Sequence, residues 1–98
     1  METFNDVING NKLVLVDFYA TWCGPCKMMH PVLEQIKSTL GDKMRIIKLD
    51  VDKHQDTAMQ HGIQSVPTLM LWRNGTMLWR QSGAMQANAL LQIIKEHL

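Results

Sequence analysis

The chain has 98 residues, of which 46% are apolar, and its ten lysine and arginine residues nearly balance nine aspartate and glutamate residues. This length and composition predict one compact domain over residues 1–98 and exclude a disordered chain. Because the charges cancel and are scattered, no strong field attracts nucleic acid or anionic membrane lipid, and we expect neither as a partner.

The N-terminal residues show no targeting signal. METFNDVING, residues 1–10, is polar and lacks the basic flank and the apolar stretch of a signal peptide. Apolar runs elsewhere are short, such as Leu13–Val16, which ends at Asp17, so no membrane-spanning helix is predicted. We expect the protein in the reducing cytosol, where structural disulfides are rare. A processed secreted protein restarted at an engineered methionine would show the same pattern, so that alternative stays open.

The first elements in chain order are a short helix and a strand. Apolar residues at helical spacing predict a helix that begins at Met1 and stops before Gly10. The apolar positions are Met1, Phe4, Val7 and Ile8. The next segment, LVLVDFYA at 13–20, is apolar on both faces, which is typical of a central strand covered on each side.

A longer helix is predicted from residue 24 to Gly41, with Pro31 bending it. Its apolar stripe consists of Met29, Val32, Leu33, Ile36 and Leu40. The segment MRIIKLDV at 44–51 follows as a second strand. DTAMQHG at 56–62 predicts a short helix closed by a glycine.

The last third of the chain predicts a hairpin and a final helix. TLMLW at 68–72 and TMLWRQS at 76–82 flank Asn74-Gly75, a pair typical of a tight β-turn. The final helix is amphipathic, with Leu90, Leu91, Ile94 and Leu98 on its apolar face. This order predicts an α/β fold whose mixed sheet has helices on both faces. The first two strands should run parallel through a right-handed crossover.

Both cysteines lie in WCGPC, residues 22–26, at the predicted start of the long helix. Cys23 at the helix start and Cys26 one turn later can reach each other, because residues three apart share a helix face. Free N–H groups and the positive end of the helix dipole stabilise a thiolate, so Cys23 is the predicted nucleophile. Cys26 is predicted to stay protonated and then to resolve a mixed disulfide.

Three other uses of the cysteine pair stay open. A structural disulfide would close a loop too small to stabilise the fold much. A zinc site would need two histidines in addition, and the histidines show no ligand spacing. We expect all four on the solvated surface; they are His30, His54, His61 and His97. In a binding subunit built on the same scaffold, the thiols would be idle.

Further along, VPT at 66–68 and SGA at 82–84 accompany WCGPCK and the strand before it, and this set closely resembles the thioredoxin family. The resemblance runs from about Phe4 to the C-terminus. It implies the thioredoxin fold, with four helices around a mixed sheet of about four strands, since the family's usual N-terminal strand is missing. It also implies a general protein-disulfide reductase that binds no cofactor or metal. Its partners would be disulfide-containing proteins and a thioredoxin reductase that draws on NADPH.

Asp17 is the one charged residue in an otherwise apolar strand, and a buried carboxylate is costly unless it is paired or protonated. Burial would raise its pKa and let it accept a proton from Cys26, which is the role that the resemblance assigns to it. The alternative is a carboxylate that reaches solvent or backbone donors. Lys48 resembles the lysine that lies near this carboxylate in the family, although a strand lysine can equally extend into water.

Pro67 begins a predicted strand, and the rarity of cis peptide bonds predicts trans. The resemblance instead implies a cis bond facing the cysteines, which leaves the Val66 backbone free to pair with an extended substrate. The implied docking surface consists of Trp22, Gly24, Pro25, Val66, Pro67, Gly83 and Ala84. Trp22 in the core is the alternative to Trp22 on that surface.

Two further expectations concern the direction of the redox reaction and the self-association of the protein. The residues between the cysteines, Gly24 and Pro25, add no charge that would make the disulfide more oxidising, which favours a reductant. Without the usual leading strand, residues 44–50 would form a sheet edge, and we expect a monomer with weak association at this edge. Arg45 and Lys48 would discourage that pairing. The eight methionines are expected mainly in the core.

Overall fold

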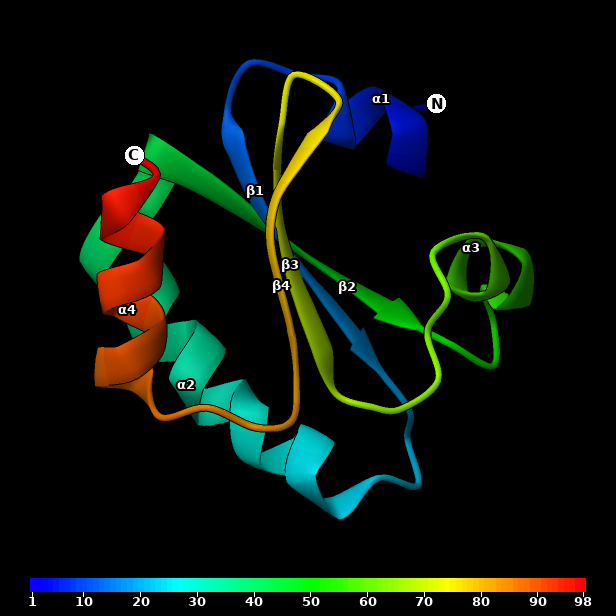
Figure 1. Ribbon diagram of the computed structural model, residues 1–98. Coiled ribbons are helices and arrows are strands. Elements are labelled where there is room, and N and C mark those ends of the chain that lie inside the picture. The colour runs from blue at the N-terminus through cyan, green and yellow to red at the C-terminus, as the bar shows by residue number, and fades with distance from the viewer.

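A four-stranded mixed sheet lies between two pairs of helices in the computed structural model, which describes residues 1–98 (Figure 1). The helices are α1 (Phe4–Ile8), α2 (Gly24–Leu40), α3 (Gln55–Gln60) and α4 (Ala87–Glu96), with a 3₁₀ turn, η1, at Gly41–Lys43. The strands are β1 (Leu13–Tyr19), β2 (Met44–Asp50), β3 (Thr68–Arg73) and β4 (Thr76–Ser82). The predicted order of elements is confirmed.

The strand order in the sheet is β2-β1-β3-β4. The β1 and β2 strands are parallel, as predicted, and their register places Asp17 beside Lys48. The β1–β3 and β3–β4 pairs are antiparallel. The predicted turn at Asn74-Gly75 has positive φ at both residues, which is the conformation that a tight hairpin requires. The β2 strand is a sheet edge, also as predicted, because β1 is its only neighbour.

Two apolar cores cover the two faces of the sheet. The larger core joins β1 and β3 to α2 and α4, through Leu13, Leu15, Met29, Leu33, Ile36, Leu69, Leu71, Leu90 and Ile94 among others. The smaller core packs α1 against the opposite face, through Val7, Ile8, Val14, Val16, Phe18 and Met70. β1 is therefore covered on both sides, which explains its continuous run of apolar residues.

The opening helix begins later than predicted. Thr3 is its N-cap, and a capping box forms because the Thr3 hydroxyl accepts from the Asp6 N–H while the Asp6 carboxylate accepts from the Thr3 N–H. The prediction that the helix begins at Met1 is wrong, since the first helical residue is Phe4 and Met1 is exposed. The long helix occupies its predicted residues: it continues through Pro31 and ends at Leu40, with Gly41 as its C-cap at a positive φ. The bend at Pro31 stays a prediction.

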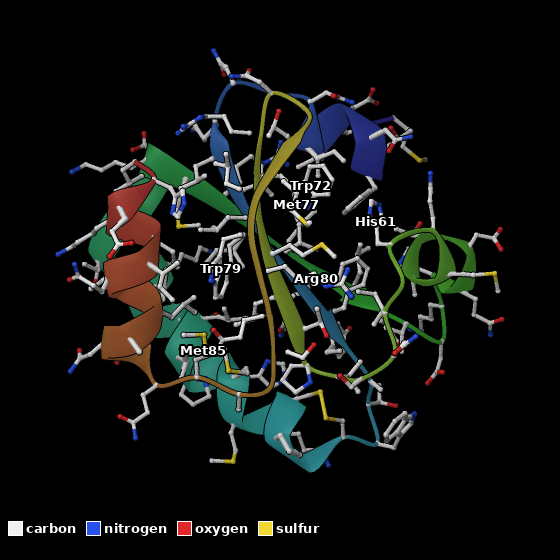
Figure 2. The ribbon with its side chains drawn as sticks, in the orientation of Figure 1. His61, Trp72, Met77, Trp79, Arg80 and Met85 are labelled. Atoms are coloured by element: carbon white, nitrogen blue, oxygen red, sulfur yellow. A yellow bond between two sulfur atoms is a disulfide. The ribbon has the colours of Figure 1, made fainter.

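The prediction that all four histidines lie on the solvated surface is correct for His30 and His54, which are exposed, and wrong for His61 and His97, which are half-buried. The ring of His61 lies between α1 and the sheet, with ring centroids 5.3 Å from Phe4, 6.3 Å from Phe18 and 5.5 Å from Trp72. Figure 2 shows His61 and Trp72 on this side of the sheet, whereas Trp79 and Met85 lie on the side of α2 and α4. Desolvation, and then the charge of Arg80, lowers the pKa of His61.

The expectation that methionines serve mainly as core filler is wrong for half of them. Met29, Met44 and Met70 are buried, and Met85 is half-buried against the larger core. Four others are exposed, namely Met1, Met28, Met59 and Met77. The flexible, weakly polar side chain of methionine is tolerated both in the core and on the surface. The spacing of methionines along the chain therefore does not separate buried from exposed ones.

Both chain termini lie at one end of the sheet, near the β3–β4 turn (Figure 1). The loop before α2 lies at the other end, where β1 and β2 end side by side. Backbone bonds tie the turn to the N-terminal region, because the Asn74 and Gly75 N–H groups donate to the carbonyls of Gly10 and Ile8 at 2.9 and 2.8 Å. The end of the sheet that carries the cysteine loop is thus distant from both termini.

Candidate active site

Cys23 and Cys26 form a disulfide across the first turn of α2, with Cα atoms 5.3 Å apart. Cys23 is the N-cap, and its Sγ accepts a hydrogen bond from the Cys26 N–H at 3.1 Å. Pro25 lies within this first turn, where a missing N–H costs no hydrogen bond. The predicted placement of both cysteines is confirmed. A sulfur that accepts from the free N–H groups of a helix start is placed where negative charge is stabilised.

Exposure does not distinguish the two cysteines, since Cys23 is 5% exposed and Cys26 is 3% exposed. Their positions in the helix differ instead. Cys23 is the N-cap outside the first turn and its Sγ accepts the backbone N–H, whereas Cys26 lies inside the turn and donates that N–H; both cysteines belong to one small apolar cluster with Ala20. The asymmetry therefore comes from hydrogen bonding and the helix dipole rather than from access to water.

The peptide bond between Val66 and Pro67 is cis, so the expectation from the family resemblance is correct and the base-rate expectation of trans is wrong. The Val66 carbonyl oxygen lies 3.7 Å from Cys23 Sγ. The Thr68 hydroxyl donates to the Ser65 carbonyl at 2.7 Å and holds the loop before the proline. The Gly83 N–H donates to the Pro67 carbonyl at 2.8 Å. These bonds bring the loop before β3 and the end of β4 beside the cysteine pair.

Trp22 lies on the surface, with 71% of its area exposed, so the core alternative is wrong. Its indole N–H donates to the Asp52 carboxylate at 3.0 Å. Together with Val66 and Ile63, Trp22 lines a hollow of about 150 Å³ beside the cysteine loop. Gly24, Pro25, Gly83 and Ala84 are also exposed, whereas Pro67 is buried.

Asp52 was not among the residues singled out from the sequence. It follows the end of β2, and its backbone N–H donates to the buried Asp50 carboxylate at 2.9 Å. A signal was present in the sequence, since two parallel strands end at the same sheet edge and the polar residues that follow them must lie together. The segment after the second strand, DVD at 50–52, therefore had to lie near WCGPC.

Asp17 is buried within β1, with 1% of its area exposed, and neither of its carboxylate oxygens has a hydrogen-bond partner. Burial raises its pKa from the ordinary value of 3.8 to about 6, partly opposed by the positive charge of Lys48. The predicted buried carboxylate is confirmed, and the alternative of a carboxylate satisfied by solvent or backbone donors is wrong. Asp17 is a group that can exchange a proton near neutral pH.

The structure agrees with both predictions for Lys48, a lysine near the Asp17 carboxylate and a lysine that extends into water. Its side chain is exposed, yet its position opposite Asp17 lets its charge act on that carboxyl. No ion pair joins the two groups. The Lys48 ammonium instead contacts His30 Nδ1 and lies 5.4 Å from the centroid of the Tyr19 ring.

No cluster of three or more histidine, cysteine or acidic side chains is arranged to hold a metal ion. The histidines lie apart: His30 contacts Lys48, His61 packs among aromatic rings, and the His97 ring contacts the Ile93 carbonyl. No helix has the length and apolar character needed to cross a membrane.

A redox-active disulfide at a helix start, beside a cis-proline loop, defines a thiol–disulfide oxidoreductase. The family model described as Thioredoxin matches residues 1–96. The chain belongs to the thioredoxin family.

Individual relatives agree with this assignment. A thioredoxin of Bacillus subtilis is 44% identical over 86 residues, which cover 88% of this chain and 83% of the relative. The chloroplastic thioredoxin Y of Oryza sativa is 41% identical over 97 residues, 98% of this chain and 58% of that protein. The crystal structure of oxidised mitochondrial thioredoxin 3 from Saccharomyces cerevisiae has a TM-score of 0.85 and 39% identity, covering 95% of this chain and 86% of that one.

Proposed function

We propose that this protein is a general protein-disulfide reductase that uses the Cys23–Cys26 pair as its redox centre. The observation that carries the proposal is the N-cap position of Cys23, whose Sγ accepts the Cys26 N–H. The same donors stabilise negative charge on Cys23 when the disulfide is reduced. Cys23 is then the attacking thiolate and Cys26 the resolving thiol.

The reaction proceeds in two exchanges. The Cys23 thiolate attacks a disulfide of the substrate, which forms a Cys23–substrate disulfide, breaks the substrate's S–S bond and releases one substrate thiolate that takes a proton from water. Cys26 then gives its proton to Asp17 and attacks Cys23 Sγ, which re-forms the Cys23–Cys26 disulfide and releases the second substrate thiolate, again to be protonated. Two electrons pass from the dithiol to the substrate.

Asp17 suits the proton transfer because its pKa of about 6 lies near the working pH. A carboxyl with an ordinary pKa would be a weaker base toward a thiol. Lys48 supports the site by limiting how far burial raises the pKa of Asp17. The burial of Asp17 and the charge of Lys48 support these proposed roles.

The surface around the disulfide suits an extended peptide. Exposed Trp22 and the hollow that it lines provide apolar contact, and the Val66 backbone lies beside Cys23 Sγ. A substrate strand that pairs with the Val66 backbone would bring its own disulfide to Cys23. The docking surface that we propose comprises Trp22, Gly24, Pro25, Val66, Pro67, Gly83 and Ala84.

We further propose that the chain acts as a single domain, holds no cofactor, and is reduced by a thioredoxin reductase that uses NADPH. We place it in the cytosol, since the two cysteines serve exchange rather than structural stapling. It is a monomer that associates weakly through the β2 edge, where Arg45 and Lys48 discourage pairing. Sedimentation up to about millimolar concentration tests this state, and a strictly monomeric profile would exclude the edge contact.

The decisive experiment is a coupled assay of insulin disulfide reduction with a thioredoxin reductase and NADPH. We expect NADPH oxidation that requires both the reductase and this protein. The matched control is the Cys23→Ser/Cys26→Ser double variant, which keeps the fold and removes the exchange. Equal rates with wild type and control would identify a binding protein with idle thiols instead.

A further inference from the structure

His30 and Lys48 contact each other at the margin of the site although they come from different elements. His30 lies on α2 four residues after Cys26, so the two side chains share one side of the helix. Lys48 lies on β2 beside Asp17 of β1. The Lys48 Nζ contacts His30 Nδ1 and lies 5.4 Å from the centroid of the Tyr19 ring.

The chemistry of this contact fixes which group donates. An ammonium group can only donate hydrogen bonds, so the Nδ1 of His30 is the acceptor and the neutral imidazole carries its proton on Nε2. An exposed lysine without an acceptor turns its ammonium into water and samples many rotamers. The imidazole and the aromatic face of Tyr19 together hold in one place a charge that would otherwise move freely.

The location of this charge matters because Asp17 has no other partner. Neither carboxylate oxygen accepts a hydrogen bond, and the residue forms no ion pair. The charge of Lys48 is the one effect that opposes the rise in the pKa of Asp17 caused by burial. Because Coulomb energy falls with distance, a lysine that swings into water acts on Asp17 less.

We propose that His30 is a positioning residue that holds the Lys48 ammonium within electrostatic range of Asp17. The positioning role rests on the proposed function in one respect, because it is in that function that Asp17 takes the proton of Cys26. The coupling between the three side chains requires no substrate and can be measured by itself.

His30 and Lys48 line a second hollow, of about 310 Å³, whose other charged residues are Glu34, Lys37 and Arg45. These other groups do not replace His30. Arg45 is paired with Glu2 at 2.8 Å, and neither Glu34 nor Lys37 forms an ion pair. None of these groups makes a hydrogen bond to the Lys48 ammonium. His30 is therefore the one side chain of α2 bonded to that ammonium.

The test follows the titration of the Asp17 carboxyl by carbon-13 NMR in the oxidised protein, so no enzyme assay enters. His30→Ala should raise the titration midpoint by about 0.5, because the freed ammonium spends more time in water. Lys48→Met removes the charge and should raise the midpoint further. The His30→Ala/Lys48→Met double variant should match Lys48→Met alone, because His30 acts through the lysine.

Two controls separate positioning from a general effect on the helix. His30→Gln keeps a side-chain acceptor and should restore part of the wild-type midpoint. Gln35→Ala, which changes an exposed residue of the same helix, should leave the midpoint unchanged. An unchanged or lowered midpoint in His30→Ala, or a double variant in which the two shifts add, would overturn the proposal.

The coupled reductase assay separates this proposal from the proposed function. If His30→Ala moves the Asp17 midpoint but the wild-type protein reduces no disulfide, the proposed function fails and the positioning role stands. If the wild type is an active reductase and the midpoint does not move, the positioning role fails and the proposed function stands.

Discussion

Asp17 and Lys48 occupy the same register position on the parallel strands β1 and β2, yet they form no ion pair. The carboxylate is buried without a hydrogen-bond partner, while the ammonium is held at the surface by His30 and Tyr19. The charge of the lysine acts on the carboxyl through space, and burial has the larger effect. The folded protein therefore carries an electrostatic cost at Asp17 that the lysine relieves only in part.

Asp17→Asn should stabilise the oxidised protein at about pH 8 and not at about pH 3. A carboxyl whose folded pKa is raised from 3.8 to about 6 binds its proton more tightly when folded, so it weakens folding as pH rises between these values. Above pH 6 the gain from removing the carboxylate should reach about 3 kcal/mol at most. Denaturant unfolding at both pH values measures it, with exposed Asp42→Asn as the control. A loss of stability at pH 8 would contradict the uncompensated burial of Asp17.

The same substitution should slow disulfide exchange, because it removes the proposed proton acceptor of Cys26. General-base catalysis contributes factors of about 100 or more, so we expect at least a tenfold fall in the rate of the resolving step. Stopped-flow reduction of a model disulfide at about pH 7 measures this rate. An unchanged rate would remove Asp17 from the site and leave the cysteines and the Pro67 loop.

The two cysteines should respond differently to replacement by serine. Cys23→Ser should abolish reduction of insulin, whereas Cys26→Ser should accumulate mixed disulfides with substrate, because the resolving thiol is missing. Non-reducing gels with and without added dithiol detect the trapped species. Adducts formed through Cys26 in the Cys23→Ser protein would reverse the proposed roles.

Asp52→Ala should weaken substrate binding by freeing the Trp22 indole. The bond from the indole N–H to Asp52 is 3.0 Å long and exposed, so its loss should raise the KM for insulin only about threefold. Asp52→Asn keeps an acceptor oxygen, so its KM should stay close to that of the wild type. If both variants behave alike, the charge of Asp52 rather than its bond to Trp22 is responsible.

Acid should weaken the packing around His61. The folded pKa of this ring lies below its ordinary value of 6.5, so the folded state binds fewer protons and loses stability as pH falls through 6.5 toward the folded pKa. His61→Phe keeps an aromatic ring and cannot ionise, so its unfolding free energy should depend less on pH between about 7 and 5. Exposed His54→Phe is the matched control, and an equal pH dependence in wild type and His61→Phe would contradict this account.

The strands, the long helix and the cysteine geometry were predictable because local patterns determine them. Continuous apolar runs predict the strands β1 and β3, and the pair Asn74-Gly75 predicts the turn. The apolar stripe predicts the helix α2. Burial of Asp17 was the favoured interpretation, since it is a single charge within a strand predicted to be covered on both faces. A carboxylate that reaches solvent or backbone donors stayed open, and the structure excludes it. The cis bond at Pro67 was predictable only from the family resemblance, because the frequency of such bonds argues against it.

The remaining features depend on contacts between distant residues, which periodicity does not encode. The start of α1 was misplaced because the Thr3–Asp6 capping box outweighs the apolar spacing of Met1. His61 was expected on the surface because its aromatic neighbours come from three separate elements. The contact between His30 and Lys48 likewise joins a helix to a strand that follows it.

The placement of both termini away from the cysteine loop has a practical consequence for engineering. A linker attached at either end emerges near the β3–β4 turn, at the opposite end of the sheet from the loop before α2 (Figure 1). That loop carries Trp22 and leads into the disulfide at the start of α2. A fused protein would therefore leave the docking face open. The fold can serve as a cassette that delivers thiol exchange to whatever it is tethered to, with the length of the tether setting the local concentration of its target.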